Sequence, residues 1–263
     1  MKKNITLFSI TLVVALGLVS LSFNSNHLAI EQNGIKITEL KGSPRFSDAG
    51  LQLISPSNTA IIAAKYTFNF AVSNFTLGAQ TPDADKKMCA NSSKGQHVHF
   101  ILDNAPYVAS YSPQIEADIK PGHHVLLAFL SRSYHESLKH KSAYIIKEFK
   151  VGNNVIDNFD ENAPHLFFSR PKGEYIGEKE TQKVMLDFYL INCKLSAKGY
   201  TVRATINGNT FTITKWVPYI IEGLPLGEVK IKLELLDKAG KLVVSPFNGV
   251  ERIATLKIEP AAK

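Results

Sequence analysis

Apolar residues recur at every second position in short runs along most of this chain. The run EVKIKLELLD, residues 228–237, is the clearest case, because its valine, isoleucine and leucines alternate with charged residues. Glycine, proline, asparagine and aspartate separate such runs, and no run keeps the 3.6-residue period of a helix. Alternation of this kind is typical of antiparallel strands that bury one face. The pattern therefore predicts an all-β protein.

The strand pattern occurs twice along the chain. Residues 66–80, YTFNFAVSNFTLGAQ, align with residues 184–198, VMLDFYLINCKLSAK, so that Phe70 meets Phe188. A second pair of segments aligns in the same way, residues 110–130 with residues 215–235. Since each copy is about the size of one ordinary domain, the repeat indicates two domains of the same fold.

The number and spacing of the predicted strands favour an immunoglobulin-like sandwich in each copy. We therefore predict two tandem immunoglobulin-like β-sandwich domains, at residues 35–155 and 160–260. The first domain carries a loop insertion at residues 77–95 that the second lacks.

The N-terminus has the three parts of a secretory signal peptide. Lys2 and Lys3 precede a long uncharged apolar run, and Ser20 and Ser22 offer small residues for cleavage. We predict that residues 1–22 are a signal peptide and that the protein is exported, to the periplasm or the cell exterior. If the segment stays uncleaved, it attaches the protein to a membrane instead.

The net charge limits the classes of binding partner, and the cysteine count limits the number of disulfides. The formal net charge is +7, which includes the two lysines of the signal peptide. Aromatic and basic residues do not interleave in stripes, so the sequence predicts no nucleic-acid partner. Cys89 and Cys193 are the two cysteines. An oxidising compartment would permit one disulfide between them, and a pair of free thiols is the alternative.

The second copy serves as an internal control for the first. By the alternation, His97, His99 and Ile101 point away from the core of the first domain, where the second copy has Thr201, Arg203 and Thr205. In the strand that ends at residue 130, His123, Val125, Leu127 and Phe129 point outward too. An apolar row of this size needs a cover, and the candidates are the second domain, a partner or the insertion.

The histidines are the candidate metal ligands. An immunoglobulin-like strand order places His97, His99 and His123 on one sheet face, with His135 just beyond the strand. Imidazole binds zinc and copper, and residues i and i+2 of a strand can reach one ion. The sequence thus predicts a zinc or copper site formed by these four histidines. The alternative is that they pack under a loop and form hydrogen bonds.

The segment SRSYH, residues 131–135, is the candidate phosphate site. It is similar to the Ser-Arg-x-His motif of forkhead-associated domains, with one residue more before the histidine. Arginine suits phosphate because its donors form a fork. Ser131, Arg132 and Ser133 are therefore the candidate ligand-binding residues, and ordinary loop residues are the alternative.

The runs CANSSKGQHVHFILDNAPYVASYSP, PGHHVLLAFLSRSYHESLK and LFFSRPKGEYIGEKETQKVMLDFYLINCKL resemble a group of exported two-domain proteins of Bacteroidota. The resemblance covers residues 35–260. Members are often labelled phosphopeptide-binding, so the resemblance implies export and that ligand class. The first half is also similar in outline to small domains built on an HxH pair, a later Gly-x-His and a closing histidine. That similarity implies a metal held by His97, His99, His123 or His124, and His135.

Three functions remain open on the sequence. The first is a non-enzymatic envelope protein that binds a ligand or protein partner on the histidine-rich face, through zinc or copper. The second is a phosphate- or phosphopeptide-binding module that uses the SRSYH segment. The third is a metalloenzyme with an open histidine site. Since the chain has no nucleophile elbow, HExxH motif or phosphate loop, we favour a function without catalysis.

Overall fold

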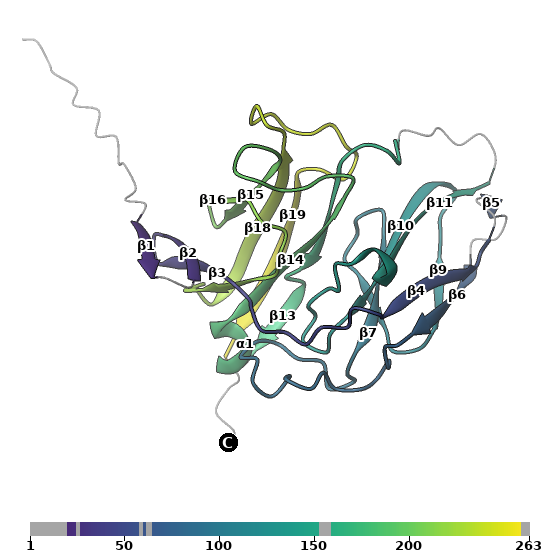
Figure 1. Ribbon diagram of the computed structural model, residues 1–263, viewed down its shortest axis with the longest axis horizontal. Helices are drawn as coiled ribbons and strands as arrows, with labels where there is room; N and C mark the ends of the chain where they lie inside the picture. Colours follow the sequence, from purple (N-terminus) through teal and green to yellow (C-terminus); the bar gives the residue numbers. More distant parts are fainter. Residues whose placement is uncertain (1–19, 25–26, 58–59, 62–64, 153–158, 259–263) are drawn as a thin grey trace, which may run out of the picture.

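The computed structural model describes the chain except residues 1–19, 25–26, 58–59, 62–64, 153–158 and 259–263 (Figure 1). The predicted signal peptide therefore lies outside the described residues, apart from its last three positions. Within the described part, no helix has the length and apolar character that a membrane span requires.

Two β-sandwiches lie side by side (Figure 1). The elements of the first are β4 (Gly50–Ser55), β5 (Ala60–Ile61), β6 (Lys65–Ser73), β7 (His97–Leu102), β8 (Val108–Ser110), β9 (Gln114–Asp118), β10 (Gly122–Ser131), η1 (Lys141–Ala143) and β11 (Tyr144–Val151). The elements of the second are β3 (Ile35–Glu39), β12 (His165–Arg170), β13 (Gly173–Ile176), α1 (Glu178–Gln182), β14 (Val184–Ile191), β15 (Thr201–Ile206), β16 (Asn209–Ile213), β17 (Tyr219–Glu222), β18 (Gly227–Leu236) and β19 (Val250–Lys257). Strands β1 (Ser20–Asn24) and β2 (His27–Gln32) extend the sheet of β3.

Each sandwich consists of two sheets packed over one apolar core. In the first, the sheet β4-β6-β9 faces the sheet β5-β11-β10-β7-β8. In the second, the sheet β1-β2-β3-β17-β14-β12 faces the sheet β13-β19-β18-β15-β16. The alternating residues of β18 lie in the second core as predicted, with Val229, Ile231 and Leu233 fully buried. The all-β, tandem immunoglobulin-like fold is confirmed.

The placement of β3 differs from the predicted domain division. Residues 35–39 were expected in the first sandwich, but β3 pairs antiparallel with β17 of the second. Ile35 and Ile37 are buried in the second core. The chain then crosses to the first sandwich before β4 (Figure 1). Alternation identifies which residues of a strand point inward, and it carries no information about which of two similar sheets the strand joins.

A third apolar cluster joins the two sandwiches. Strands β7 and β10 are neighbours, as the immunoglobulin-like order requires, and their outer faces lie against β12 and β14. Val125, Leu127 and Phe129 pack there against Phe167 and Tyr189 of the second sandwich. The expectation that the apolar row is covered is therefore confirmed, and the second domain provides the cover.

A buried ion pair accompanies this apolar contact. Lys139, in the loop after β10, places its Nζ atom 2.5 Å from Oδ1 of Asp187 on β14, and Asp187 is fully buried. The backbone N–H of Ser137 donates to the same carboxylate over 3.2 Å. A buried carboxylate with a charged partner and a second donor satisfies the condition under which burial of charge is tolerated. The two sandwiches are therefore docked by a specific polar contact as well as by apolar packing.

Candidate metal centre

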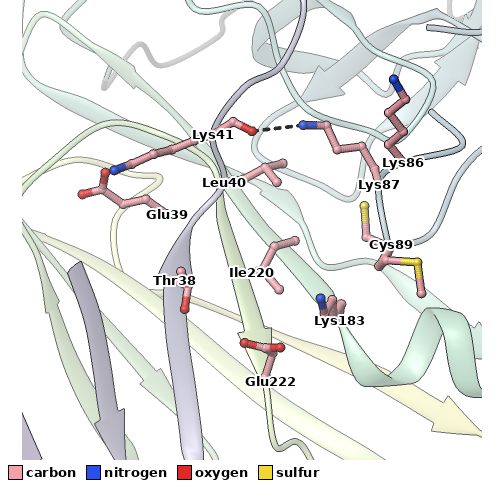
Figure 2. Close-up of a pocket in the computed structure, with 11 residues that line it drawn as sticks. Thr38, Glu39, Leu40, Lys41, Lys86, Lys87, Cys89, Lys183, Ile220 and Glu222 are labelled. Atoms are coloured by element: carbon pink, nitrogen blue, oxygen red, sulfur yellow. Dashed lines mark hydrogen bonds between the residues drawn. The ribbon is translucent and has the colours of Figure 1, made fainter. Parts of the chain in front are cut away.

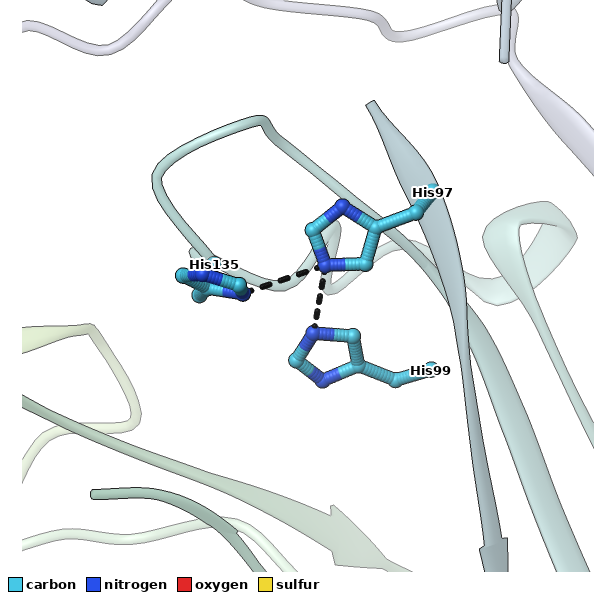
Figure 3. A group of neighbouring side chains, drawn as sticks. All are labelled: His97, His99 and His135. Carbon is cyan, nitrogen blue, oxygen red and sulfur yellow. Dashed lines mark hydrogen bonds between the residues drawn. The ribbon is translucent and has the colours of Figure 1, made fainter. Parts of the chain in front are cut away.

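Three histidines converge at one end of the contact between the sandwiches (Figure 3). Nε2 of His97 lies 2.9 Å from Nε2 of His99 and 3.1 Å from Nδ1 of His135. The three nitrogens all lie within 4.8 Å of one another. His97 and His99 come from the same face of β7, because they are two residues apart in a strand. We refer to His97, His99 and His135 as the histidine cluster.

His135 reaches the cluster because the loop after β10 turns back sharply. The backbone N–H of His135 donates to the carbonyl of Arg132 over 2.9 Å, and His135 itself has a φ of 69°. That left-handed conformation is uncommon for a residue other than glycine and indicates local strain. The side chains of Arg132 and Glu136 hold the turn through an ion pair of 2.9 Å. Strain retained at a point where polar side chains meet is a recognised mark of a functional site.

The histidine cluster is buried and uncharged. His97 and His99 have no exposed surface, and His135 is partly exposed. Burial lowers the pKa of His97 to about 4, against a smaller opposing effect of its hydrogen bond to the backbone carbonyl of Gly95. Burial also lowers the pKa of His99 and of His135 well below the usual value, and the charge of Arg170 adds to this. All three rings are therefore neutral at pH 7, which is the form that binds metal ions.

The hydrogen bonds leave more lone pairs than protons at the centre of the cluster. Nδ1 of His97 lies 2.8 Å from the carbonyl of Gly95, so that nitrogen carries the proton and Nε2 is a bare acceptor. If His99 donates to that acceptor, and the hydroxyl of Tyr107 donates over 3.2 Å to Nδ1 of His135, this Nδ1 is bare as well. Two bare nitrogens then lie 3.1 Å apart. A cation between them would remove this conflict.

The distances between the three nitrogens are close to those expected around one bound ion. Two imidazole nitrogens bound tetrahedrally to zinc at 2.0–2.1 Å are about 3.4 Å apart. The two contacts made by His97 are slightly shorter than this, and the distance between the other two nitrogens is at most 4.8 Å. Binding one ion would therefore require the His99 and His135 nitrogens to move closer together and both to move slightly away from His97. The cluster could therefore hold a transition metal that prefers imidazole, such as zinc or copper.

The second sandwich supplies the surroundings of the cluster. The hydroxyl of Ser169 lies 3.1 Å from Nδ1 of His99. Arg170 donates from Nη1 to the hydroxyl of Tyr107 over 2.8 Å, and the Tyr107 ring stacks on the ring of His99, with centroids 3.6 Å apart. The ammonium of Lys172 lies over the same phenol ring, 4.4 Å from its centroid. Partners of this kind fix the orientation of metal-binding imidazoles.

An irregularity in β12 explains how Ser169 and Arg170 both face the first sandwich. The register of β12 against β14 shifts between Phe168 and Arg170, so Ser169 is an extra residue in the ladder. A β-bulge turns side chains away from strict alternation. Strict alternation would send one of these two residues into the core of the second sandwich. No sequence signal predicts the bulge, so Ser169 and Arg170 are absent from the predicted site, as is Tyr107 in the loop between β7 and β8.

His123 does not join the cluster, and its inclusion among the predicted metal ligands needs correction. His123 lies at the start of β10, and its Nε2 lies 3.2 Å from Oε2 of Glu148. On that strand Phe129 is the residue opposite His99, six positions further on. At ~3.3 Å per residue this places His123 roughly 20 Å away. The predicted face was right, but a shared face does not bring together residues at opposite ends of a strand.

The predicted phosphate-binding residues are buried and engaged with the protein. Ser131 and Ser133 have no exposed surface, and the backbone N–H of Ser133 donates to the hydroxyl of Thr81 over 2.9 Å. Arg132 is 7% exposed, pairs with Glu136 and donates to the carbonyl of Pro44. These contacts fasten the insertion and the loop of His135 to the first sandwich. None of the three residues presents its side chain to solvent as a phosphate ligand would require.

The two cysteines are free thiols. Cys89 is buried in the insertion beside a cavity of about 330 Å³ (Figure 2), and burial raises the pKa of its thiol to about 11. The cavity is rimmed by lysines, and Lys87 donates from its ammonium to the carbonyl of Lys41 over 3.0 Å. A protonated, buried thiol is a poor nucleophile and a poor metal ligand. Cys89 therefore adds no chemistry to the histidine cluster.

No protein-family model matches the chain, and neither does any curated protein. Three solved structures illustrate what the fold is similar to. The fibronectin(III)-like modules of CbhA from Clostridium thermocellum are 11% identical with a TM-score of 0.29, over 81% of this chain and 97% of that one. SGBP-B of Bacteroides ovatus, in complex with a mixed-linkage heptasaccharide, is 13% identical with a TM-score of 0.23, over 78% of this chain and 47% of that one. The Ig1-2 module of the Drosophila receptor protein tyrosine phosphatase DLAR is 8% identical with a TM-score of 0.24, over 80% of this chain and 100% of that one. The fold assignment rests on the sheets described above.

Proposed function

We propose that this protein is an exported, non-enzymatic binding module that takes up one transition-metal ion, zinc or copper, at His97, His99 and His135. The observation that carries the proposal is the convergence of three neutral imidazole nitrogens within 4.8 Å in a buried site. Proteins bind both metals with ligand sets of three nitrogens that leave one coordination position open. Export is proposed from the N-terminal sequence, and it would bring the protein to a compartment where such ions are acquired from outside the cell.

The alternative is a purely structural role, in which the three histidines bind no metal and only form hydrogen bonds. Two features favour metal binding over it. The central nitrogen of His97 faces two other nitrogens but has a single lone pair for them. His135 also enters the cluster from a left-handed backbone conformation, which is uncommon for residues other than glycine and recurs at functional sites.

A phosphopeptide-binding role has less support. Arg132 would have to leave its ion pair with Glu136 before its guanidinium could hold a phosphate. Breaking a buried ion pair in this way costs about 3–5 kcal/mol.

Metal analysis of the full chain, purified without a histidine tag, tests the proposal. Elemental analysis after exposure to excess zinc or copper and removal of unbound ions should give about one ion per chain. His99→Ala should lose that ion, because it removes one of the three ligands. His123→Ala is the matched control, since it removes a histidine from the same sheet face far from the cluster, and it should retain the ion. Equal metal content in all three proteins, or none in any, would overturn the proposal.

A further inference from the structure

The charges around the histidine cluster distinguish between the two metals. Arg170 is 6% exposed, and within the described residues its guanidinium makes one hydrogen bond, to Tyr107, and no ion pair. Lys172 donates from its ammonium to the backbone carbonyl of Tyr107 over 2.6 Å. Two cations therefore flank the site, and the group of candidate ligands found in the described chain contains histidines alone, without a carboxylate.

Arg170 is close enough to the cluster for its charge to matter. Two hydrogen bonds, of 2.8 and 3.2 Å, connect its Nη1 atom through the hydroxyl of Tyr107 to Nδ1 of His135. Buried aromatic rings surround His99, among them Tyr107 and Phe129. Water screens little in such an interior, so the repulsion between a bound cation and Arg170 is substantial.

We infer that the site selects Cu(I) over Zn(II), and that Arg170 and Lys172 of the second sandwich determine this selectivity. The inference rests on the proposed function. Coulomb repulsion scales with the product of the charges, so each flanking cation disfavours a divalent ion twice as strongly, in free energy, as a monovalent one. A site of three neutral imidazoles has no negative charge with which to offset the difference. Selection here follows from charge rather than from the soft sulfur ligands that usually favour Cu(I).

Coordination number points the same way. Zinc in proteins is almost always four-coordinate, so beside the three histidines it needs a fourth ligand, either a water molecule or a protein oxygen. The hydroxyl of Tyr107, 3.2 Å from Nδ1 of His135, already accepts a hydrogen bond from Arg170. Its ring is nearly parallel to the ring of His99, at 7°, and the stacking keeps the phenol oxygen out of the imidazole plane in which the ion would lie. Cu(I), with its single charge, is satisfied by three nitrogens and needs no fourth ligand.

Competition titrations of the full chain test the inference. Cu(I), kept reduced without oxygen, and Zn(II) are each titrated against a coloured chelator of known affinity. Wild type should bind Cu(I) more tightly than Zn(II). Arg170→Met removes the charge and keeps much of the side-chain length. It should raise the affinity for Zn(II) about a hundredfold and for Cu(I) about tenfold, so that the preference for Cu(I) falls about tenfold.

Three further variants make the result specific. Arg170→Lys keeps the charge and should keep the preference. Lys172→Met removes the other flanking cation from a half-buried position and should lower the preference in the same direction, which protects the test if Arg170→Met folds poorly. Arg203→Met is the control: Arg203 lies on β15 of the second sandwich and pairs with Glu234 over 2.8 Å, so its charge is offset and the preference should not change.

The outcomes separate this inference from the proposed function. Binding of neither metal overturns both. If wild type binds Zn(II) as tightly as Cu(I), the site is a metal site without the selectivity inferred here. An unchanged preference in both Arg170→Met and Lys172→Met shows that the flanking cations are not responsible, and it overturns the inference while leaving the metal site in place.

Discussion

The phenol ring of Tyr107 and the imidazole of His99 stack face to face, with their centroids 3.6 Å apart and their planes 7° from parallel. Tyr107 thereby connects the two sandwiches. Its ring packs on a histidine of the first, and its hydroxyl accepts a hydrogen bond from Arg170 of the second. The histidine cluster thus depends on the docking of the two domains.

Removing the hydroxyl of Tyr107 should destabilise the protein without disturbing the ring stack. Tyr107→Phe leaves the buried guanidinium of Arg170 without its one hydrogen bond among the described residues. A buried donor left unsatisfied costs about 1–3 kcal/mol. We expect the free energy of unfolding in urea to fall by that amount. The control is Tyr111→Phe, at a tyrosine that contacts His97 from the half-exposed edge of the site, where the loss should be smaller.

Acid should destabilise the metal-free protein through the same cluster. The pKa of His97 is about 4 in the folded chain and about 6.5 when unfolded, so the unfolded state binds more protons between these values. The free energy of unfolding is therefore highest above pH 6.5, and the contribution of His97 to it is lost as the pH falls towards 4. Within that window His97 contributes a slope of up to about 1.4 kcal/mol per pH unit. His99 and His135, whose pKa values are lowered as well, steepen it.

Urea unfolding at pH 7, 6 and 5 measures this slope. A His97→Gln, His99→Gln double variant removes two of the titrating groups and should show a distinctly flatter dependence on pH than wild type. If the two slopes agree, the histidines are not protonated on unfolding in this range, and the neutral cluster described above is incorrect.

The fold could be predicted from the sequence, and the site only in part. The period-two pattern and the repeat define sandwiches because burial of one sheet face dictates alternation. The same alternation identified His97 and His99 as outward neighbours. It could not place His123, since position along a strand depends on register, nor Ser169 and Arg170, which depend on a bulge. His135 was predicted as a ligand from its place just after the strand. What brings its ring to the cluster is the tight turn held by Arg132 and Glu136.

Removal of Asp187 from its ion pair with Lys139 should strongly destabilise the docked arrangement of the two sandwiches. Asp187→Ala leaves the ammonium of Lys139 without its carboxylate, in contact distance of the Tyr189 and Trp216 rings. Breaking a buried pair by removal of one partner costs about 3–5 kcal/mol. We expect a loss of that size in urea unfolding. In the double variant Asp187→Ala, Lys139→Met part of the stability should return, because the uncompensated charge is gone; a further additive loss would show that the two side chains act independently.

The contact between the sandwiches should be most sensitive at Leu127. This side chain is fully buried in the apolar cluster between β10 and β14, and its neighbours there are aromatic and aliphatic. Leu127→Lys would place an ammonium group among them without a partner, and the chain would have to expose the interface to solvate it. The expected result is a lower midpoint of thermal unfolding, together with a larger hydrodynamic radius if the two sandwiches separate. Val244→Lys is the matched control, because Val244 is 93% exposed and should accept the same substitution with no measurable change. Equal stability and equal radius in both variants would mean that the two sandwiches do not dock through this face in solution, and the histidine cluster would then lose the cover that Ser169 and Arg170 of the second sandwich form over it.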